Sequence, residues 1–265
     1  MFAQRKHKKS VELGVFLGGS YYIGDLNPIR HFDQFTKPAG GLVCRYNFNP
    51  RLAARANFLL GRVEAHDEFS PFTGQQQRNL SFQSSITEFS TQLEFNFLNY
   101  EIGDEKAKFS PYLFGGIAGF SFEPEGQYYD EWVSLKPLAT EGQGLPGSTA
   151  KSYKLFQISL PFGVGVKINV AKNMSLGLEW GMRKTFTDYL DDVSTRYYDP
   201  KKLEANKGTL SVAMADQSKG VDAGYNNIGR QRGNPTTKDW YSFAGAVLTI
   251  RLKGKREECP GVGYH

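Results

Sequence analysis

The chain is poor in the residues and runs that most often reveal a function. Its 265 residues include two cysteines, four methionines and four histidines. No apolar run reaches the roughly 18 residues that suggest a transmembrane helix, and the mean hydropathy is −0.46. These shortages exclude a helical span. They leave a membrane β-barrel open, because alternating strands average to an unremarkable hydropathy.

Cysteine and charge are equally uninformative. Cys44 lies in a predicted strand and Cys259 in a tail, so a disulfide between them requires the tail to fold back. No CxxC pair or Cys/His spacing typical of zinc occurs. The net charge of +5 is spread along the chain without a basic patch interleaved with aromatic residues. We therefore expect no nucleic-acid partner.

The chain does have a regular alternation of apolar residues with polar or small ones. From Phe156 to Val170 every even position is apolar, and after a turn at 171–174 the pattern resumes from Leu176 to Met182. Strict period two predicts strands. Each arm is also about as long as a tilted strand that crosses a bilayer. The 29 glycines and 14% aromatic residues favour sheet over helix as well.

Similar segments recur along the chain. We expect eight strands, at 11–23, 40–48, 53–64, 85–98, 112–122, 153–170, 175–186 and 240–252. Short connections at 49–51, 99–110 and 171–174 alternate with long ones at 25–38, 65–84, 123–152 and 187–239. This alternation predicts an eight-stranded up-and-down antiparallel transmembrane β-barrel with short periplasmic turns and long extracellular loops. A soluble barrel is the alternative, but it would not normally carry a connection as long as 187–239.

The same topology predicts the bacterial outer membrane as the location, with both termini periplasmic. Residues 1–10 then form a basic periplasmic segment, 11–252 the barrel, and 253–265 a periplasmic tail. Residues 2–4, Phe-Ala-Gln, resemble the end of a secretory leader whose apolar part lies upstream.

The face opposite the apolar stripe carries equal numbers of acids and bases. These predicted lumen charges are Glu12, Arg45, Arg55, Glu88, Glu94, Lys167, Glu179 and Arg183. Eight strands leave a lumen that side chains can fill, and a charge left unpaired there would be costly. Four acids against four bases therefore predict a closed, ion-paired interior rather than a selective pore.

Three further features concern packing. Gly163 and Gly165 lie in mid-strand, where they make room for bulky neighbours in a narrow barrel. Pro161 predicts a bulge or local bend. The strands at 112–122 and 240–252 are apolar or glycine on both faces, so their orientation stays open.

Aromatic residues gather near the strand ends, as they do in the interface girdles of membrane proteins. The predicted girdle pairs are Tyr21 with Tyr22, Tyr46 with Phe48, Phe97 with Tyr100, Phe109 with Tyr112, Phe186 with Tyr189, and Trp240 with Tyr241.

Candidate chemistry is sparse. His31 and His66 lie in the first two long loops, where a barrel hydrolase or acyltransferase would place them, but no GxSxG or HExxH motif supports an enzyme. Asp188, Asp191, Asp192 and Asp199 either collect calcium or form a solvated acidic loop. Their spacing lacks EF-hand order and favours the loop. We expect no catalytic residue, cofactor, metal or small-molecule substrate.

Basic residues flank the barrel at both ends of the sequence. Arg5, Lys6, Lys8 and Lys9 precede the first strand, and further bases follow the last. They predict either contact with lipid headgroups or a docking face for an acidic periplasmic partner. The predicted docking residues are Asn49, Arg51, Lys106, Lys108, Lys253, Lys255 and Arg256.

Several segments also resemble a known family. They are 11–27, RYNFNPR at 45–51, EFNFL at 94–98, FSPYLFGG at 109–116, TEGQG at 140–144 and GLEWGMRKTFTDYLDDVS at 177–194. Together they resemble the PorG family of small outer-membrane β-barrels linked to the type IX secretion system. The resemblance implies a non-enzymatic barrel that helps to hold the periplasmic lipoprotein ring of PorK and PorN at the outer membrane. The alternative is a barrel whose long loops bind a surface ligand or partner.

Overall fold

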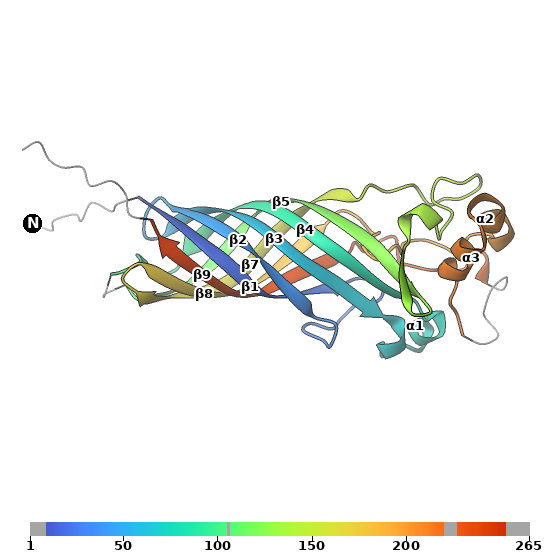
Figure 1. The fold of residues 1–265 in the computed structure, drawn as a ribbon, viewed down its shortest axis with the longest axis horizontal. Helices are drawn as coiled ribbons and strands as arrows, with labels where there is room; N and C mark the ends of the chain where they lie inside the picture. Colours follow the sequence, from blue (N-terminus) through green and yellow to red (C-terminus); the bar gives the residue numbers. More distant parts are fainter. Residues whose placement is uncertain (1–8, 105–106, 220–226, 253–265) are drawn as a thin grey trace, which may run out of the picture.

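The computed structural model describes residues 9–104, 107–219 and 227–252. The described residues form one antiparallel sheet, three short α-helices and two 3-10 helices (Figure 1). The strands are β1 (Ser10–Ile23), β2 (Lys37–Asn47), β3 (Leu52–His66), β4 (Ser81–Asn96), β5 (Phe109–Tyr128), β6 (Glu131–Ser134), β7 (Phe156–Ala171), β8 (Met174–Thr185) and β9 (Trp240–Arg251). The α-helices are α1 (Thr73–Arg78), α2 (Pro200–Lys207) and α3 (Thr209–Ala215), and the 3-10 helices span Asp67–Phe69 and Lys136–Leu138.

Eight strands close into a barrel. The strand order is β4-β3-β2-β1-β9-β8-β7-β5, and the pairing of β4 with β5 completes the ring. β6 pairs only with the end of β5, as a hairpin beyond the barrel wall. Every pairing is antiparallel, including that of the first strand with the last. The predicted eight-stranded up-and-down barrel is confirmed.

The barrel is apolar outside and polar inside. On β7 the even-numbered apolar residues face outward, and their exposed fractions run from 39% for Val166 to 65% for Phe156. On β4, Phe89 and Leu93 are more than half exposed, whereas Glu88, on the opposite face, is fully buried. A soluble barrel has the opposite arrangement, so this wall faces lipid. None of the described helices is long and apolar enough to cross a membrane.

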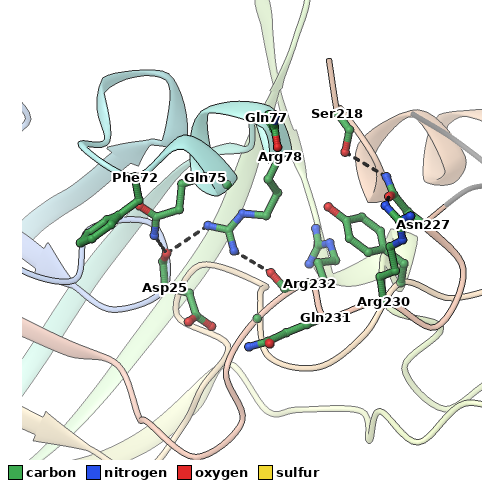
Figure 2. Close-up of a pocket in the computed structure, with 13 residues that line it drawn as sticks. Asp25, Phe72, Gln75, Gln77, Arg78, Ser218, Asn227, Arg230, Gln231 and Arg232 are labelled. Carbon is green, nitrogen blue, oxygen red and sulfur yellow. Dashed lines mark hydrogen bonds between the residues drawn. The ribbon is translucent and has the colours of Figure 1, made fainter. Parts of the chain in front are cut away.

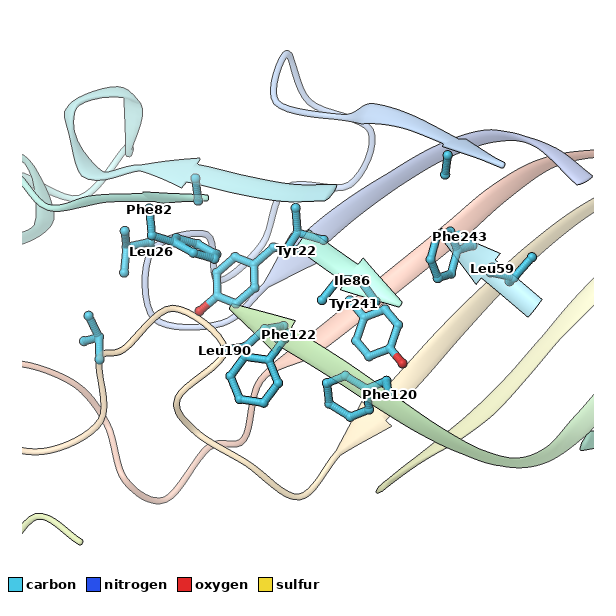
Figure 3. Close-up of a cluster of buried hydrophobic side chains, with 14 of the residues drawn as sticks. Tyr22, Leu26, Leu59, Phe82, Ile86, Phe120, Phe122, Leu190, Tyr241 and Phe243 are labelled. Carbon is cyan, nitrogen blue, oxygen red and sulfur yellow. The ribbon is translucent and has the colours of Figure 1, made fainter. Parts of the chain in front are cut away.

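β5 and β9, the two strands whose inner and outer faces the sequence leaves open, each have one face toward the lumen and one toward lipid. Tyr112 and Phe120 of β5 and Tyr241 of β9 point inward, whereas Leu113 of β5 and Leu248 of β9 point outward. Phe120 and Tyr241 belong to an aromatic cluster in the half of the barrel near the long loops (Figure 3). The loop residue Leu190 is fully buried in the same cluster, so the loops anchor in the barrel core.

The predicted aromatic girdle is wrong for several of its members. Tyr22, Tyr112 and Tyr241 are buried inside the barrel, and Tyr100 is buried in a turn. Successive positions on a strand alternate faces. Two residues an odd number of positions apart therefore cannot both face lipid.

Of the bulge or local bend expected at Pro161, the bulge is absent. The β5–β7 ladder lacks the pairs at Pro161 and Leu160 but resumes in the same register, with Gly115 opposite Phe162 and Ala118 opposite Ser159. The register shift in β7 lies instead at Asn169/Ala171, beside the turn to β8. The missing N–H of Pro161 thus interrupts the β5–β7 hydrogen bonds without shifting the register of the two strands.

The mid-strand glycines do make room for rings. A Cβ at Gly165 would lie 2.4 Å from Tyr112 Cζ, and a Cβ at Gly163 would lie 2.5 Å from Phe114 Cζ. Tyr112 and Phe114 occupy the lumen over these two positions.

The two ends of the barrel differ in build. β1 begins and β9 ends at one end, together with the short connections; we call it the short-turn end (Figure 1). The three α-helices and the long connections lie at the other, the loop end. The mouths of the barrel are therefore covered by different kinds of segment.

Candidate functional site

The middle of the lumen is an ion-pair network. Arg45 contacts two acids, with Nη1 2.7 Å from Glu12 Oε2 and Nε 3.1 Å from Glu94 Oε2. Arg55 Nη1 lies 2.6 Å from Glu179 Oε2 and 3.8 Å from Glu94 Oε2. Each arginine therefore bridges acids from different strands.

The remaining predicted lumen charges are paired too. Lys167 Nζ donates to Glu94, and Arg183 Nε lies 3.0 Å from Glu88 Oε2. The Tyr241 hydroxyl donates to the same Glu88 oxygen at 2.9 Å. All eight side chains are at least 93% buried. A lumen filled with paired charges suits a closed barrel rather than a pore.

The short-turn mouth is covered by the segment 97–104. Its Tyr100 hydroxyl lies 2.5 Å from Ser175 Oγ and 2.7 Å from Asn169 Oδ1. Ile102 is buried beside it, with 2% of its surface exposed. This connection is therefore a plug as well as a turn.

The predicted docking residues that the structure describes lie at this end. Asn49 Oδ1 accepts the backbone N–H groups of Arg51 and Leu52 at 2.8 and 2.9 Å, and Arg51 Nε donates to Asn99 Oδ1 at 3.0 Å. Lys108 is exposed beside β7. Two short connections are thus hydrogen-bonded into one surface. The other predicted docking residues lie outside the described residues: Lys106, Lys253, Lys255 and Arg256.

The long connections build a structured cap at the loop end. We define this loop-end cap as residues 139–153, 187–199 and 227–239, with Asp25 and α1 against it. Glu141 accepts the backbone N–H of Ser194 at 2.9 Å and the Thr195 hydroxyl at 2.7 Å. Arg232 Nη1 lies 3.2 Å from Glu141 Oε1. Segments nearly 100 residues apart thus share one buried ion pair.

A second buried pair ties α1 to the cap. Arg78 binds Asp67 through Nε and Nη2, both at 2.7 Å, and donates through Nη1 to the Arg232 carbonyl at 2.6 Å. Burial opposes the charge on Arg78, but Asp67 outweighs it and raises the pKa of Arg78 above its ordinary value. The charge is therefore permanent.

The acidic run is buried, which corrects the expectation of a solvated loop. Asp188, Asp191 and Asp192 are each at most 3% exposed. Asp192 accepts the Thr140 hydroxyl at 2.5 Å and the Tyr153 hydroxyl at 2.7 Å. Burial raises the pKa of Asp192 to about 6. The pattern misled because hydroxyl groups far away in the sequence, those of Tyr22, Thr140 and Tyr153, bind Asp191 and Asp192.

Asp199 alone in this run is a surface residue. It is the N-cap residue of α2, and its Oδ1 accepts the backbone N–H of Lys201 at 2.9 Å. Within the described ranges no group of three or more His, Cys, Asp or Glu is arranged to hold a metal ion.

A polar pocket of about 470 Å³ opens at the loop end (Figure 2). Its lining comes from the connection after β1, from α1 and from the connection before β9, and includes Asp25, Arg78, Tyr197, Asn227, Arg230 and Arg232. Sequence reasoning missed this pocket because its residues lie far apart in the chain and form no motif. The one available signal was the TEGQG segment, which contains Glu141, the partner of Arg232.

The loop histidines belong to separate clusters. His31 Nδ1 lies 3.0 Å from the Tyr21 hydroxyl on the outer wall, where the Trp180 indole N–H also donates to Tyr21 at 2.7 Å. His66 Nε2 lies 3.0 Å from Glu64, and its ring stacks on Phe35. The free thiol of Cys44 lies on the lipid-facing side of β2, and Cys259 lies outside the described residues.

Comparison with known proteins identifies a family and similar structures. No curated protein matches the chain. Similar solved structures include a major outer membrane protein of Thermus thermophilus, with 12% identity, a TM-score of 0.43, and coverage of 93% of this chain and 100% of that one. The N-terminal β-barrel domain of Pseudomonas aeruginosa OprF has 10% identity, a TM-score of 0.39 and coverage of 93% and 100%. Ail, the attachment invasion locus protein of Yersinia pestis, has 11% identity, a TM-score of 0.40 and coverage of 92% and 97%.

The family of the chain is identified from its sequence. The model described as "Domain of unknown function (DUF6089)" matches residues 1–207, which include seven of the eight barrel strands and the start of the longest loop. The chain belongs to the DUF6089 family.

Proposed function

We propose that this protein is a non-enzymatic scaffold subunit of the bacterial outer membrane. In this role it holds a periplasmic ring of the PorK and PorN type at the membrane, as part of the type IX secretion and gliding machinery. The lipid-facing wall is the anchor, and the short-turn end is the docking face. The resemblance of segments such as 177–194 to the PorG family supplies the identity of the partner.

One structural observation carries the docking role. At the short-turn end, Arg51 donates to Asn99, and the Pro50 carbonyl accepts the backbone N–H of Tyr100 at 3.1 Å. The connections 49–51 and 97–104 therefore present a single, preformed surface. Preformed surfaces bind with less loss of conformational freedom than loops that must first be ordered.

Topology supports the proposed orientation of the barrel in the membrane. In outer-membrane barrels the short turns face the periplasm and the long loops face outward. β1 begins and β9 ends at the short-turn end, so the proposed orientation puts both strand ends on the periplasmic side. Exposed Arg51 and Lys108 add positive charge to that side, which suits an acidic partner.

Charge reversal at each end of the barrel tests this role. The variant Arg51→Glu/Lys108→Glu should reduce recovery of the periplasmic ring proteins in pull-downs from detergent-solubilised membranes. The matched control, Lys202→Glu/Lys207→Glu, makes the same change in charge on exposed residues of α2 at the loop end. Heat-modifiable gel mobility would show that both variants still form barrels. Full recovery with the short-turn variant would refute the docking face.

The loop-end pocket favours a second candidate function, the binding of a surface ligand or partner by the extracellular loops. A polar pocket of about 470 Å³ is large enough for a small ligand, and buried ion pairs fix its walls. The same experiment separates the two candidates. Loss of a partner in the α2 variant alone would favour loop binding over the scaffold role.

A further inference from the structure

Two buried carboxyl groups of the loop-end cap share one tyrosine hydroxyl. Tyr22 Oη lies 2.5 Å from Asp191 Oδ2 and 3.0 Å from Asp239 Oδ1. All three residues have at most 1% of their surface exposed. A phenol has a single proton to donate. With Tyr22 donating to one carboxylate, the second contact becomes a full hydrogen bond when the other carboxyl group carries a proton.

The outer oxygens of the pair hold the backbone of the cap. Asp191 Oδ1 accepts the N–H of Val193, and Asp239 Oδ2 accepts the N–H of Leu190, both at 2.9 Å. Leu190 and Val193 are themselves buried in the aromatic cluster of the barrel. The carboxyl pair thus connects β1 to the two sides of the longest loop, at the point where that loop enters the core.

The surroundings do not neutralise a second negative charge. The charged groups that face the pair are Asp25 from the connection after β1, Arg78 from α1, Asp188 from the longest loop, and Lys238 next to Asp239. Arg78 is already bound to Asp67 through two bonds, and Lys238 is 41% exposed and 3.9 Å from Asp188. No ion pair between described residues includes Asp191 or Asp239.

A separate observation also indicates missing positive charge. Asp188 Oδ1 is buried and has no hydrogen-bond partner among the described residues. An ionised carboxylate in this position would be left without compensation on one oxygen, which is costly in a buried site. Protons held by the cluster remove that cost.

We propose that a proton shared by Asp191, Tyr22 and Asp239 locks the loop-end cap onto the barrel, and that its loss at alkaline pH releases residues 187–195. The device is independent of the scaffold role, since it acts on the loop end only. It makes the outward-facing loops sensitive to the pH of the medium. Asp25, which faces the pair, also lines the pocket, so release of the cap changes that pocket.

The direction of the effect follows from burial. Burial, and next the charges of neighbouring acids, hold the pKa of both Asp191 and Asp239 well above the ordinary range. Acids with a raised pKa stabilise the closed cap fully at pH values below their open-state pKa. This contribution is lost as the pH rises through the closed-state pKa. Asp188 and Asp192, with pKa values raised to about 6, begin the loss, and the shared proton extends it to higher pH.

Hydrogen exchange of the folded barrel in detergent, followed by mass spectrometry from pH 6 to 8, tests the lock. After correction for the intrinsic rate, the opening constant of 187–195 should rise about tenfold per pH unit for each proton released. In Asp191→Asn the amide can donate to Tyr22, which then donates to Asp239. The opening of residues 187–195 should then release one proton fewer. The rise of the opening constant with pH should therefore be smaller by about a factor of ten per pH unit.

A second variant and one control variant keep the test decisive. Asp239→Asn makes the mirror-image arrangement and should lower the slope by the same amount. Asp130→Asn, on the exposed β5–β6 turn, should leave the slope unchanged. Slopes that are equal in wild type, Asp191→Asn and Asp239→Asn would overturn the proposal. Protection at pH 8 that requires added calcium and disappears with a chelator would also overturn it, in favour of a bound cation.

Discussion

The lumen and the loop-end cap are both buried and highly charged, but they balance their charges differently. In the lumen, four acids face four bases, and every one forms an ion pair. In the cap, Asp191, Asp192 and Asp239 are satisfied by hydroxyl and backbone N–H donors without an ion pair among the described residues. The difference shows that burial alone does not decide how a carboxyl group is stabilised.

The backbone explains why the lumen and the loop-end cap balance their charges differently. Strand register places side chains of four different strands at one level of the barrel, so oppositely charged side chains can be paired directly across a narrow lumen. Loops cannot offer that repeating geometry, but they present free N–H groups at turns. We therefore expect the cap, where Asp191 and Asp239 form no ion pair among the described residues, to respond to pH.

The largest expected effect is the loss of Glu94, the acid on which Arg45, Arg55 and Lys167 converge. Glu94→Gln keeps the volume but leaves three buried cations with less negative charge. Removing one member of a buried ion pair costs about 3–5 kcal/mol, so this variant should lose at least that much stability. The measurement is the urea midpoint of the heat-modifiable folded band in lipid vesicles.

A matched control for this variant is Glu68→Gln, which makes the same chemical change on an exposed residue at the loop end. It should shift the midpoint little, because exposed charges contribute at most about 1 kcal/mol. If the two variants shift the midpoint equally, the lumen network does not stabilise the barrel.

A smaller effect is expected for the pair Glu88 and Arg183, because Tyr241 also supports Glu88. Each single variant, Glu88→Gln or Arg183→Met, should cost about 3 kcal/mol by leaving a buried charge unpaired. The double variant should cost less than the sum, since it removes both charges together. Strictly additive losses in the same urea titration would mean that the two side chains are not coupled.

The lumen could be predicted from the sequence because period two assigns each residue to a face. Glu12, Arg45 and Glu94 lie opposite apolar stripes that are visible in the sequence, and the structure brings them together. The same rule should have excluded Tyr22 and Tyr241 from the girdle, since each follows an aromatic residue by one position. Local pattern is enough where one periodic element determines the environment.

The cap could not be predicted in this way. Asp192 reads as an exposed loop acid because its partners, Thr140 and Tyr153, come from another loop about 40 to 50 residues earlier. No periodicity connects the two segments, and the contact depends on where the barrel places the ends of β5, β7 and β8. The resemblance at 140–144 and 177–194 marked both segments without showing that they touch.

The smallest expected effect concerns Asp199, an acid of the cap that solvent reaches. Its side chain accepts the N–H of Lys201 at the start of α2 and takes no part in the buried cluster. Asp199→Ala removes the N-cap side chain of α2, which costs about 1 kcal/mol of helix stability. Hydrogen exchange of α2 should therefore accelerate about fivefold, with no change at residues 187–195 and no change in its dependence on pH. Faster exchange at 187–195 as well would mean that α2 and the buried carboxyl pair open as one unit. The cluster of Asp191, Tyr22 and Asp239 would then also stabilise α2, which it does not contact directly.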